Sequence, residues 1–314
     1  MNIKKVVRFL VLLSKILKEV GQIKPDLVYV TPNAKGGAFF KEFVVVQILK
    51  VMNCKVVAHY HNKGVSMKQE QWLYNRLYKR FFKGIKVILL GKSLYQDVKK
   101  YVGWENVYIC PNGIPTDVRC KKEEVRGNHP NPRLLFLSNL IESKGVIVLL
   151  DALKILKDRD CQFVCNFVGG ETVEIDAKRF EEEVRKRELE RVAIYQGKKY
   201  GEEKNIALKQ ADILVFPTYY ETFGLVNLEA MEHSLPVVST NEGAITDIIE
   251  DGVTGLIAKR KDPQSLADKI ELLLKDSALR KKMGQAGYEK YMKEFTLEVF
   301  ERRMCEILKQ LCLN

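Results

Sequence analysis

Short runs of apolar residues alternate along the chain with longer segments whose apolar positions recur every three or four residues. The short runs are typical of buried strands, and the longer segments are typical of helices that pack through one face. Strands are predicted at residues 26–32, 54–61, 86–91, 106–114, 133–137, 161–170 and 213–217, with helices at 38–52, 68–84, 93–102 and 146–156 between them. Because strands and helices take turns, the pattern predicts an α/β protein built on parallel sheets.

A polar stretch without periodicity, residues 119–132, divides this pattern and is the predicted linker. Charge divides the chain at the same place: residues 1–118 hold 20 Lys and Arg against 7 Asp and Glu, whereas the remainder holds 32 against 33. We therefore predict a basic first domain over 1–118, a second domain over 133–287 and C-terminal helices over 288–314. A basic half commonly faces nucleic acid, an anionic membrane or a phosphorylated substrate, but the sequence has no nucleic-acid-binding motif, so no nucleic-acid partner is expected.

The cysteines, the histidines and the N-terminus exclude several classes of protein. Seven Cys without a CxxC pair indicate a reducing compartment, and four His without ligand spacing give no recognisable zinc site. The apolar run from Phe9 to Leu13 is too short to span a bilayer, and no cleavage site follows it. The sequence thus predicts a cytoplasmic protein whose N-terminal amphipathic helix either packs on a sheet or contacts the inner face of the membrane.

Two carboxylates, Glu221 and Glu229, are separated by seven residues across a predicted strand-to-helix junction. The amides of Phe223, Gly224 and Leu225 lie between them at the helix start, where an anion such as a diphosphate can bind. The simpler interpretation is that both are solvated acids that complement the helix dipole. Carboxylates flanking an anion cradle suit a sugar attached to a diphosphate.

This stretch resembles the E-x7-E signature of the retaining GT-B glycosyltransferases of the large GT4 family. Residues 231–270 continue the likeness, through a "DG-x-x-G" strand and a "D-P-x-x-L" helix start. The resemblance covers roughly residues 24–310. It implies two Rossmann-like domains that face each other across a cleft. It also implies that a sugar moves, with retention and without a metal or other cofactor, from a nucleotide diphosphate to a surface-polysaccharide or glycolipid acceptor.

The resemblance also assigns roles to individual residues. Glu221 would orient the donor sugar as a catalytic carboxylate, and Glu229 would accept hydrogen bonds from the ribose. Lys144 matches the lysine that clamps the donor diphosphate, but Asn139 stands where the family usually has arginine, so one cationic contact is replaced by a neutral one. The other residues assigned to a UDP- or GDP-linked donor are Phe223, Gly224 and Leu225 at the helix start and Gly197 and Lys198 beside the base.

Two histidines end the predicted strand 54–61. His61 matches a histidine that the family places near the donor sugar, and it is the second catalytic candidate. His59 alternates with it along the strand and could belong to the core. His233 lies within a helix, and we interpret it as a packing residue.

The beginning of the chain departs from the family pattern. Members normally carry a strand, a Gly-rich loop, a helix and another strand before the equivalent of residue 24, so the resemblance implies a shortened N-terminal domain. Three alternatives stay open: an enzyme with a reduced acceptor domain, an enzyme that needs a partner subunit to supply this segment, or an inactive glycan-binding or scaffold subunit. A nucleotide-sugar 2-epimerase of similar architecture is a further alternative, although segment 221–229 argues against it.

The predicted helix 68–84 interleaves aromatic with basic residues. It suits either peripheral contact with an anionic membrane that presents a lipid-linked glycan, or a buried helix with a basic outer face. The last helices, 288–314, resemble those that cross back to the first domain in the family.

Overall fold

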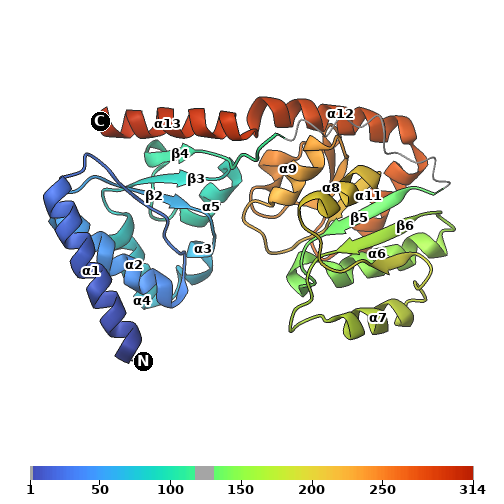
Figure 1. Ribbon diagram of the computed structural model, residues 1–314, viewed down its shortest axis with the longest axis horizontal. Coiled ribbons are helices and arrows are strands. Elements are labelled where there is room, and N and C mark those ends of the chain that lie inside the picture. The colour runs from blue at the N-terminus through green and yellow to red at the C-terminus, as the bar shows by residue number, and fades with distance from the viewer. Residues whose placement is uncertain (1–2, 117–130, 314) are drawn as a thin grey trace. The chain divides into compact units, whose positions relative to one another are not determined.

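The computed structural model describes residues 3–116 and 131–313 of the chain. These residues fall into two compact units, Met1–Pro111 with Arg302–Asn314 and Asn112–Glu301. Each unit is an α/β body with its own parallel sheet (Figure 1), so the predicted α/β class with two Rossmann-like domains is confirmed. The predicted boundary at residue 118 and most of the predicted linker lie outside the described residues.

The sheet of the first unit, as far as the structure describes it, has four strands in the order β1-β2-β3-β4. They are β1 (Val28–Val30), β2 (Val56–Tyr60), β3 (Lys86–Leu89) and β4 (Val107–Ile109). All five residues of β2 are buried, as expected for a central strand covered on both faces. Within the sheet β1 pairs with β2 alone, with Val28 opposite Val56, so β1 is an edge strand.

The helices of the first unit are α1 (Ile3–Ile23), α2 (Gly36–Val51), α3 (Val65–Lys68), α4 (Trp72–Phe82) and α5 (Tyr95–Val98). α2 and α4 lie side by side (Figure 1). Three of the aromatic residues of α4, Tyr78, Phe81 and Phe82, are buried, whereas Trp72 is 71% exposed. Most aromatic side chains of α4 therefore belong to the core, which favours the buried-helix alternative for this segment.

The second unit holds a six-stranded parallel sheet, counted over its described residues, in the order β10-β9-β8-β5-β6-β7. The strands are β5 (Arg133–Leu137), β6 (Val164–Val168), β7 (Ala193–Tyr195), β8 (Ile213–Phe216), β9 (Val237–Thr240) and β10 (Gly255–Ala258). Because all of them are parallel, their C-terminal ends share one edge, and the chain reverses its strand order between β5 and β8. Ligands of doubly wound sheets bind at such an edge.

The helices of the second unit complete the layers around this sheet. They are α6 (Val146–Asp158), α7 (Ala177–Lys186), α8 (Gly201–Gln210), α9 (Leu225–Glu232), α10 (Ile245–Ile248), α11 (Pro263–Lys275) and α12 (Ser277–Glu294). α6 packs its buried residues onto the sheet and lies beside α11 (Figure 1). The last helix, α13 (Leu297–Leu313), begins among residues of the second unit and ends among residues of the first.

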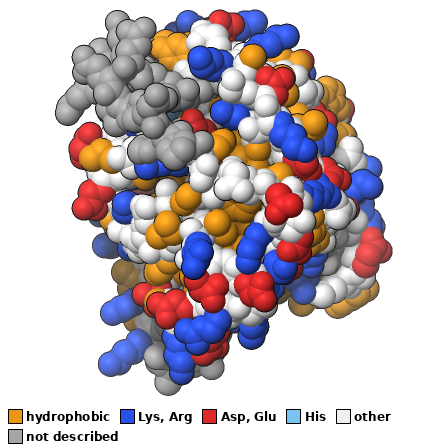
Figure 2. All heavy atoms as spheres, turned by 90° about the vertical axis from the view of Figure 1, so that its right-hand side faces the viewer, with side chains coloured by type: hydrophobic (Ala, Val, Ile, Leu, Met, Phe, Trp, Pro, Cys, Tyr) orange, Lys and Arg blue, Asp and Glu red, His pale blue; other side chains and the backbone are white. Residues whose placement is uncertain are grey.

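Figure 2 shows one face of the second unit, on which Lys and Arg side chains are interspersed with Asp and Glu. This mixture agrees with the near balance of charge counted from residue 119 onward. None of the described helices combines the length and apolar character needed to cross a membrane.

Candidate functional site

The loops that follow β5 and β8 are tied together at the C-terminal edge of the second sheet. The loop after β5 contains a 3-10 turn, Glu142–Lys144, and the Ser143 carbonyl accepts two hydrogen bonds from the loop after β8. These come from the Thr218 hydroxyl at 3.0 Å and from the Tyr219 N–H at 2.9 Å. The two segments that the sequence assigned to the donor therefore form one surface.

Lys144 and Glu221 meet on this surface. The Nζ of Lys144 lies 2.7 Å from Oε2 of Glu221, and the side chains are 23% and 18% exposed. The other carboxylate oxygen of Glu221 accepts a hydrogen bond of 2.8 Å from the Thr222 N–H. A partly buried ammonium–carboxylate pair is a charge-assisted contact, so a phosphate that Lys144 binds has to compete with Glu221.

Helix α9 starts directly after this carboxylate loop. Its N-cap residue, Gly224, has φ +84°, and a Cβ there would lie 2.7 Å from the Asn227 side-chain nitrogen, so glycine is required. Gly224 has no side chain that could cap the helix, and none of the described residues supplies a side-chain cap hydrogen bond in its place. Phe223 is buried at 3% exposure, whereas Leu225 is 44% exposed. The predicted anion-binding amides thus belong to an uncapped helix N-terminus on a glycine turn.

Glu229 lies inside α9, at a different contact from Glu221. Its Oε1 is 3.0 Å from Nζ of Lys204 on α8, with side chains 23% and 31% exposed. The sequence did not single out Lys204. The structure therefore places each carboxylate of the E-x7-E stretch beside its own lysine.

Asn139, Gly197 and Lys198 gather around the glycine turn that ends β6. The Asn139 side-chain oxygen accepts a hydrogen bond of 3.1 Å from the Gly170 N–H, and the Gly197 carbonyl accepts one of 2.9 Å from the Gly169 N–H. A Cβ on Gly170 would lie 3.1 Å from the Asn139 oxygen and 3.5 Å from Cδ of Lys198. Three predicted residues from the loops after β5 and β7 thus meet at the turn after β6, with Asn139 serving as an acceptor for the main chain.

The histidine pair belongs to the first unit. His61 follows the last residue of β2 and is exposed, and its ring centre lies 4.1 Å from that of His59. His59 is fully buried, and its Nδ1 lies 2.5 Å from the Tyr29 hydroxyl. Burial, and secondly the charge of His61, lower the pKa of His59 to about 3, and partial desolvation by the neighbouring residues lowers the pKa of His61. Both rings are therefore neutral at pH 7, and His59 is a core residue.

Two further observations concern residues that the sequence weighed. His233 is 2% exposed and caps the end of α9, with its Nδ1 2.8 Å from the Glu229 carbonyl, which agrees with a packing role. Across the described ranges, no three His, Cys, Asp or Glu side chains are grouped so that they could hold a metal ion.

Sequence reasoning missed Glu242, a buried carboxylate beside the Glu221 loop. It follows the C-terminal end of β9 at 2% exposure and pairs with Arg260. Glu221 follows β8 in the same way, so its position after a strand of the same sheet was a signal that could have identified it.

The two Rossmann-like units, with these residues at the strand ends of the second, define the GT-B class of proteins. The chain belongs to the family described as "Glycosyl transferases group 1", whose model matches residues 119–290, more than half of its length. The expected resemblance to GT4-type glycosyltransferases is thereby confirmed at the level of the family.

Individual relatives agree with this assignment. The chain is 33% identical over 164 residues to an uncharacterized glycosyltransferase of Methanocaldococcus jannaschii. This alignment covers 52% of this chain and 44% of the relative. It is 25% identical over 304 residues to the sulfoquinovosyl transferase SQD2 of Arabidopsis thaliana. This alignment covers 91% of this chain and 57% of the relative. The chain therefore spans about half the length of these two relatives. The fold matches that of the Anabaena protein HepE in complex with UDP, with a TM-score of 0.80 at 19% identity over 95% of this chain and 82% of that one.

Proposed function

We propose that the protein transfers a sugar from a nucleotide diphosphate, with UDP-glucose as the first candidate donor, to a hydroxyl of a polysaccharide or glycolipid. The observation that carries this proposal is the Lys144–Glu221 pair beside the uncapped start of α9. It combines a cation for a diphosphate with a carboxylate for sugar hydroxyls, within a family that is named for this reaction. The UDP and UDP-glucose complexes of HepE support the choice of base.

In the proposed reaction, the residues stabilise the charge of the departing diphosphate. Lys144 exchanges the Glu221 carboxylate for a phosphate oxygen, and the first amides of α9 donate to the same anion. Each such donor typically lowers the barrier by about 3 kcal/mol. Glu221, released from Lys144, accepts hydrogen bonds from the sugar and holds its ring, while Glu229 binds the ribose. Transfer occurs with retention and without a metal, as the resemblance of segment 221–229 implies.

The test is nucleotide release from a panel of UDP-, GDP- and ADP-sugars by purified wild type and Glu221→Gln. We expect release from one donor, its loss in Glu221→Gln, and no change in Glu182→Gln, a control at an exposed glutamate of α7. Activity that survives EDTA would support metal independence, and the coupling constant of the new anomeric proton would report retention. The proposal would be overturned if the wild type released nucleotide from none of the donors and also bound none of the nucleotides.

For the acceptor side, we propose that α1 contacts an anionic membrane that presents a lipid-linked acceptor. Along this helix the apolar residues Val7, Leu10 and Leu17 are 53%, 56% and 36% exposed. Among the side chains of this helix that the structure describes, the exposed cations are Lys4, Arg8, Lys15 and Lys18. An amphipathic basic helix with exposed apolar side chains binds the headgroup region through both effects.

Flotation with vesicles tests this contact. We expect binding to phosphatidylcholine vesicles that contain phosphatidylglycerol, weaker binding to phosphatidylcholine alone, and loss of binding in Leu10→Ser/Leu17→Ser. Val51→Ser, at an apolar residue of α2 that is 84% exposed, is the matched control. Equal binding of the double variant and wild type would contradict a membrane role for α1.

A further inference from the structure

The buried carboxylate of Glu242 is directed at the loop that carries Glu221. Its Oε2 accepts a hydrogen bond of 2.5 Å from the Arg260 guanidinium, and its Oε1 accepts a longer one of 3.4 Å from the main-chain N–H of Glu221. The Glu242 side chain is 2% exposed and that of Arg260 is 50% exposed. A carboxylate buried to this degree is costly unless it is paired, so these contacts account for its burial.

The main chain beside Glu242 is pressed against the same loop. The Ala244 N–H donates a hydrogen bond of 2.8 Å to the Thr222 carbonyl. Gly243, which lies between Glu242 and Ala244 in the sequence, has φ +55°. A Cβ at this position would lie 2.4 Å from the Glu221 carbonyl oxygen and 2.5 Å from the Thr222 carbonyl oxygen. The backbone of segment 242–244 therefore touches the backbone of Glu221 and Thr222 without space for a side chain.

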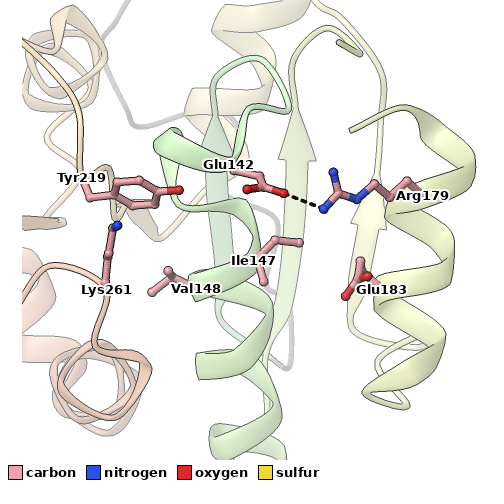
Figure 3. A pocket seen from close by; sticks show the side chains of 7 residues that line it. All are labelled: Glu142, Ile147, Val148, Arg179, Glu183, Tyr219 and Lys261. Atoms are coloured by element: carbon pink, nitrogen blue, oxygen red, sulfur yellow. Dashed lines mark hydrogen bonds and ion pairs between the residues drawn. The ribbon is translucent and has the colours of Figure 1, made fainter. Parts of the chain in front are cut away.

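The residue after Arg260, Lys261, makes a second contact with the loop that carries Glu221. The Nζ of Lys261 lies 4.4 Å from the ring centre of Tyr219, as Figure 3 shows at one end of a pocket of about 410 Å³. At the other end of this pocket, Glu142 and Arg179 form an ion pair with each other. Arg260 and Lys261 both belong to the short connection between β10 and α11. This connection thus holds the 218–222 loop at two points, through Lys261 on Tyr219 and through Arg260 and Glu242 on Glu221.

We propose that Glu242, held by Arg260, is a positioning residue that fixes the main chain of Glu221, so that the Glu221 carboxylate is placed for the donor sugar. The inference rests on the proposed function, because it takes Glu221 as the ligand of the sugar hydroxyls. The Glu242 carboxylate acts through the N–H of Glu221, and the neighbouring Ala244 N–H holds the Thr222 carbonyl. In this proposal Glu242 itself makes no contact with the donor. Loss of Glu242 should therefore weaken the sugar part of the binding and leave the nucleotide part unchanged.

The experiment compares wild type with Glu242→Gln, Arg260→Met and Arg260→Lys. The control is Lys259→Met, at the exposed lysine next to Arg260. Amide exchange of residues 218–224 measures how firmly the loop is held. Calorimetry with UDP and with UDP-glucose measures the two parts of binding separately.

In Glu242→Gln and Arg260→Met we expect faster exchange in 218–224 with unchanged exchange in β5 and β6. The affinity for UDP-glucose should fall roughly ten-fold, which corresponds to the loss of one charged hydrogen bond. The affinity for UDP should stay within about two-fold of the wild-type value. Arg260→Lys should recover part of both changes. The double variant Glu221→Gln/Glu242→Gln should bind UDP-glucose no more weakly than Glu221→Gln, because the two residues act at one contact.

Three results would overturn the inference. They are unchanged exchange in 218–224, altered exchange with no change in the ratio of UDP-glucose to UDP affinity, and additive losses in the double variant. A wild type that binds UDP but no UDP-sugar would instead contradict the proposed donor role of Glu221. The exchange measurement would then still decide whether Glu242 holds the loop.

Discussion

Lys144 and Glu221 are 77 residues apart in the sequence, and their side chains form an ion pair of 2.7 Å at the edge of the second sheet. The lysine that we propose for phosphate and the carboxylate that we propose for sugar hydroxyls thus form an ion pair with each other in this structure. A ligand that engages both must replace each partner of this pair.

Lys144→Met should weaken UDP binding roughly 10- to 100-fold, because a charge-assisted hydrogen bond to phosphate is worth about 1.5–3 kcal/mol. Calorimetry with UDP at two salt concentrations is the measurement, and the salt dependence should decrease in the variant. Lys178→Met, at an exposed lysine of α7, should behave as wild type. Unchanged affinity in Lys144→Met would show that this lysine does not contact the diphosphate.

Glu221→Gln should change the affinities for UDP and for UDP-glucose in opposite directions. With the carboxylate removed, Lys144 no longer has a competing anion, so UDP should bind at least as tightly as to wild type. UDP-glucose should lose the advantage that its hydroxyls give it over UDP. The ratio of the two dissociation constants tests this, and a parallel loss for both ligands would contradict the separation of roles.

Lys204→Met should remove the ion pair that fixes the Glu229 side chain, without unfolding the protein. Part-exposed pairs such as this one contribute about 0–1 kcal/mol to stability, so the melting temperature should change little. UDP binding should fall by about five-fold if Glu229 needs this lysine to face the ribose. Lys209→Met, also on α8, is the control, and equal UDP affinities of the two variants would argue against an orienting role for Lys204.

His59 should make the first unit sensitive to acid. Its pKa is lowered from 6.5 to about 3 by burial, so between these values the unfolded chain binds a proton that the folded chain does not. Stability contributed by the neutral ring is complete above pH 6.5. It is lost as the pH falls toward 3, with a slope of at most about 1.4 kcal/mol per pH unit.

Tryptophan fluorescence can measure this effect, because Trp72 and Trp104 are the two tryptophans of the chain and both belong to the first unit. Urea unfolding followed in this way at pH 4, 5 and 7 should show a flatter pH dependence in His59→Leu than in wild type. The same slope in both proteins would mean that His59 is protonated within the fold.

Lys50 is expected to stabilise the contact between α2 and α4. Its Nζ donates hydrogen bonds of 2.8, 2.7 and 2.7 Å to the carbonyls of Arg80, Phe81 and Lys83, at the C-terminal end of α4. A cation at this place satisfies helix-end carbonyls and complements the helix dipole. Lys50→Met should therefore lower the free energy of unfolding of the first unit by about 2 kcal/mol. Lys41→Met, at an exposed lysine of the same helix, should lower it by much less.

The alternation of strands and helices was predictable because parallel strands buried on both faces leave short apolar runs. Strand β8, for example, occupies 213–216 of the predicted 213–217. The predicted helix 93–102 was wrong in extent, since α5 ends at Val98 and a turn brings Val102 into the core. Local apolar spacing does not reveal where the tertiary core ends a helix.

The site residues were predictable as types and positions but not as partners. Glu221 and Lys144 lie in loops that follow strands and Glu229 lies in the helix after one of these loops, and that placement can be read from the sequence. The contacts of Glu229 with Lys204 and of Asn139 with Gly170 join residues 25 and 31 positions apart, and only the packed sheet brings them together. Glu242 stands in the polar stretch Thr240–Gly243, which has the composition of an exposed turn, so its burial could not be foreseen.

The edge strand β1 has a practical consequence for work in solution. Its three residues pair with β2 on one side, and Tyr29 is 42% exposed. Parallel strands are normally covered, and an open edge offers N–H and C=O groups to strands of other molecules. Concentrated samples are therefore expected to self-associate through this edge, giving sedimentation that depends on concentration and is independent of nucleotide. Binding measurements are best made at dilutions where light scattering shows a single species.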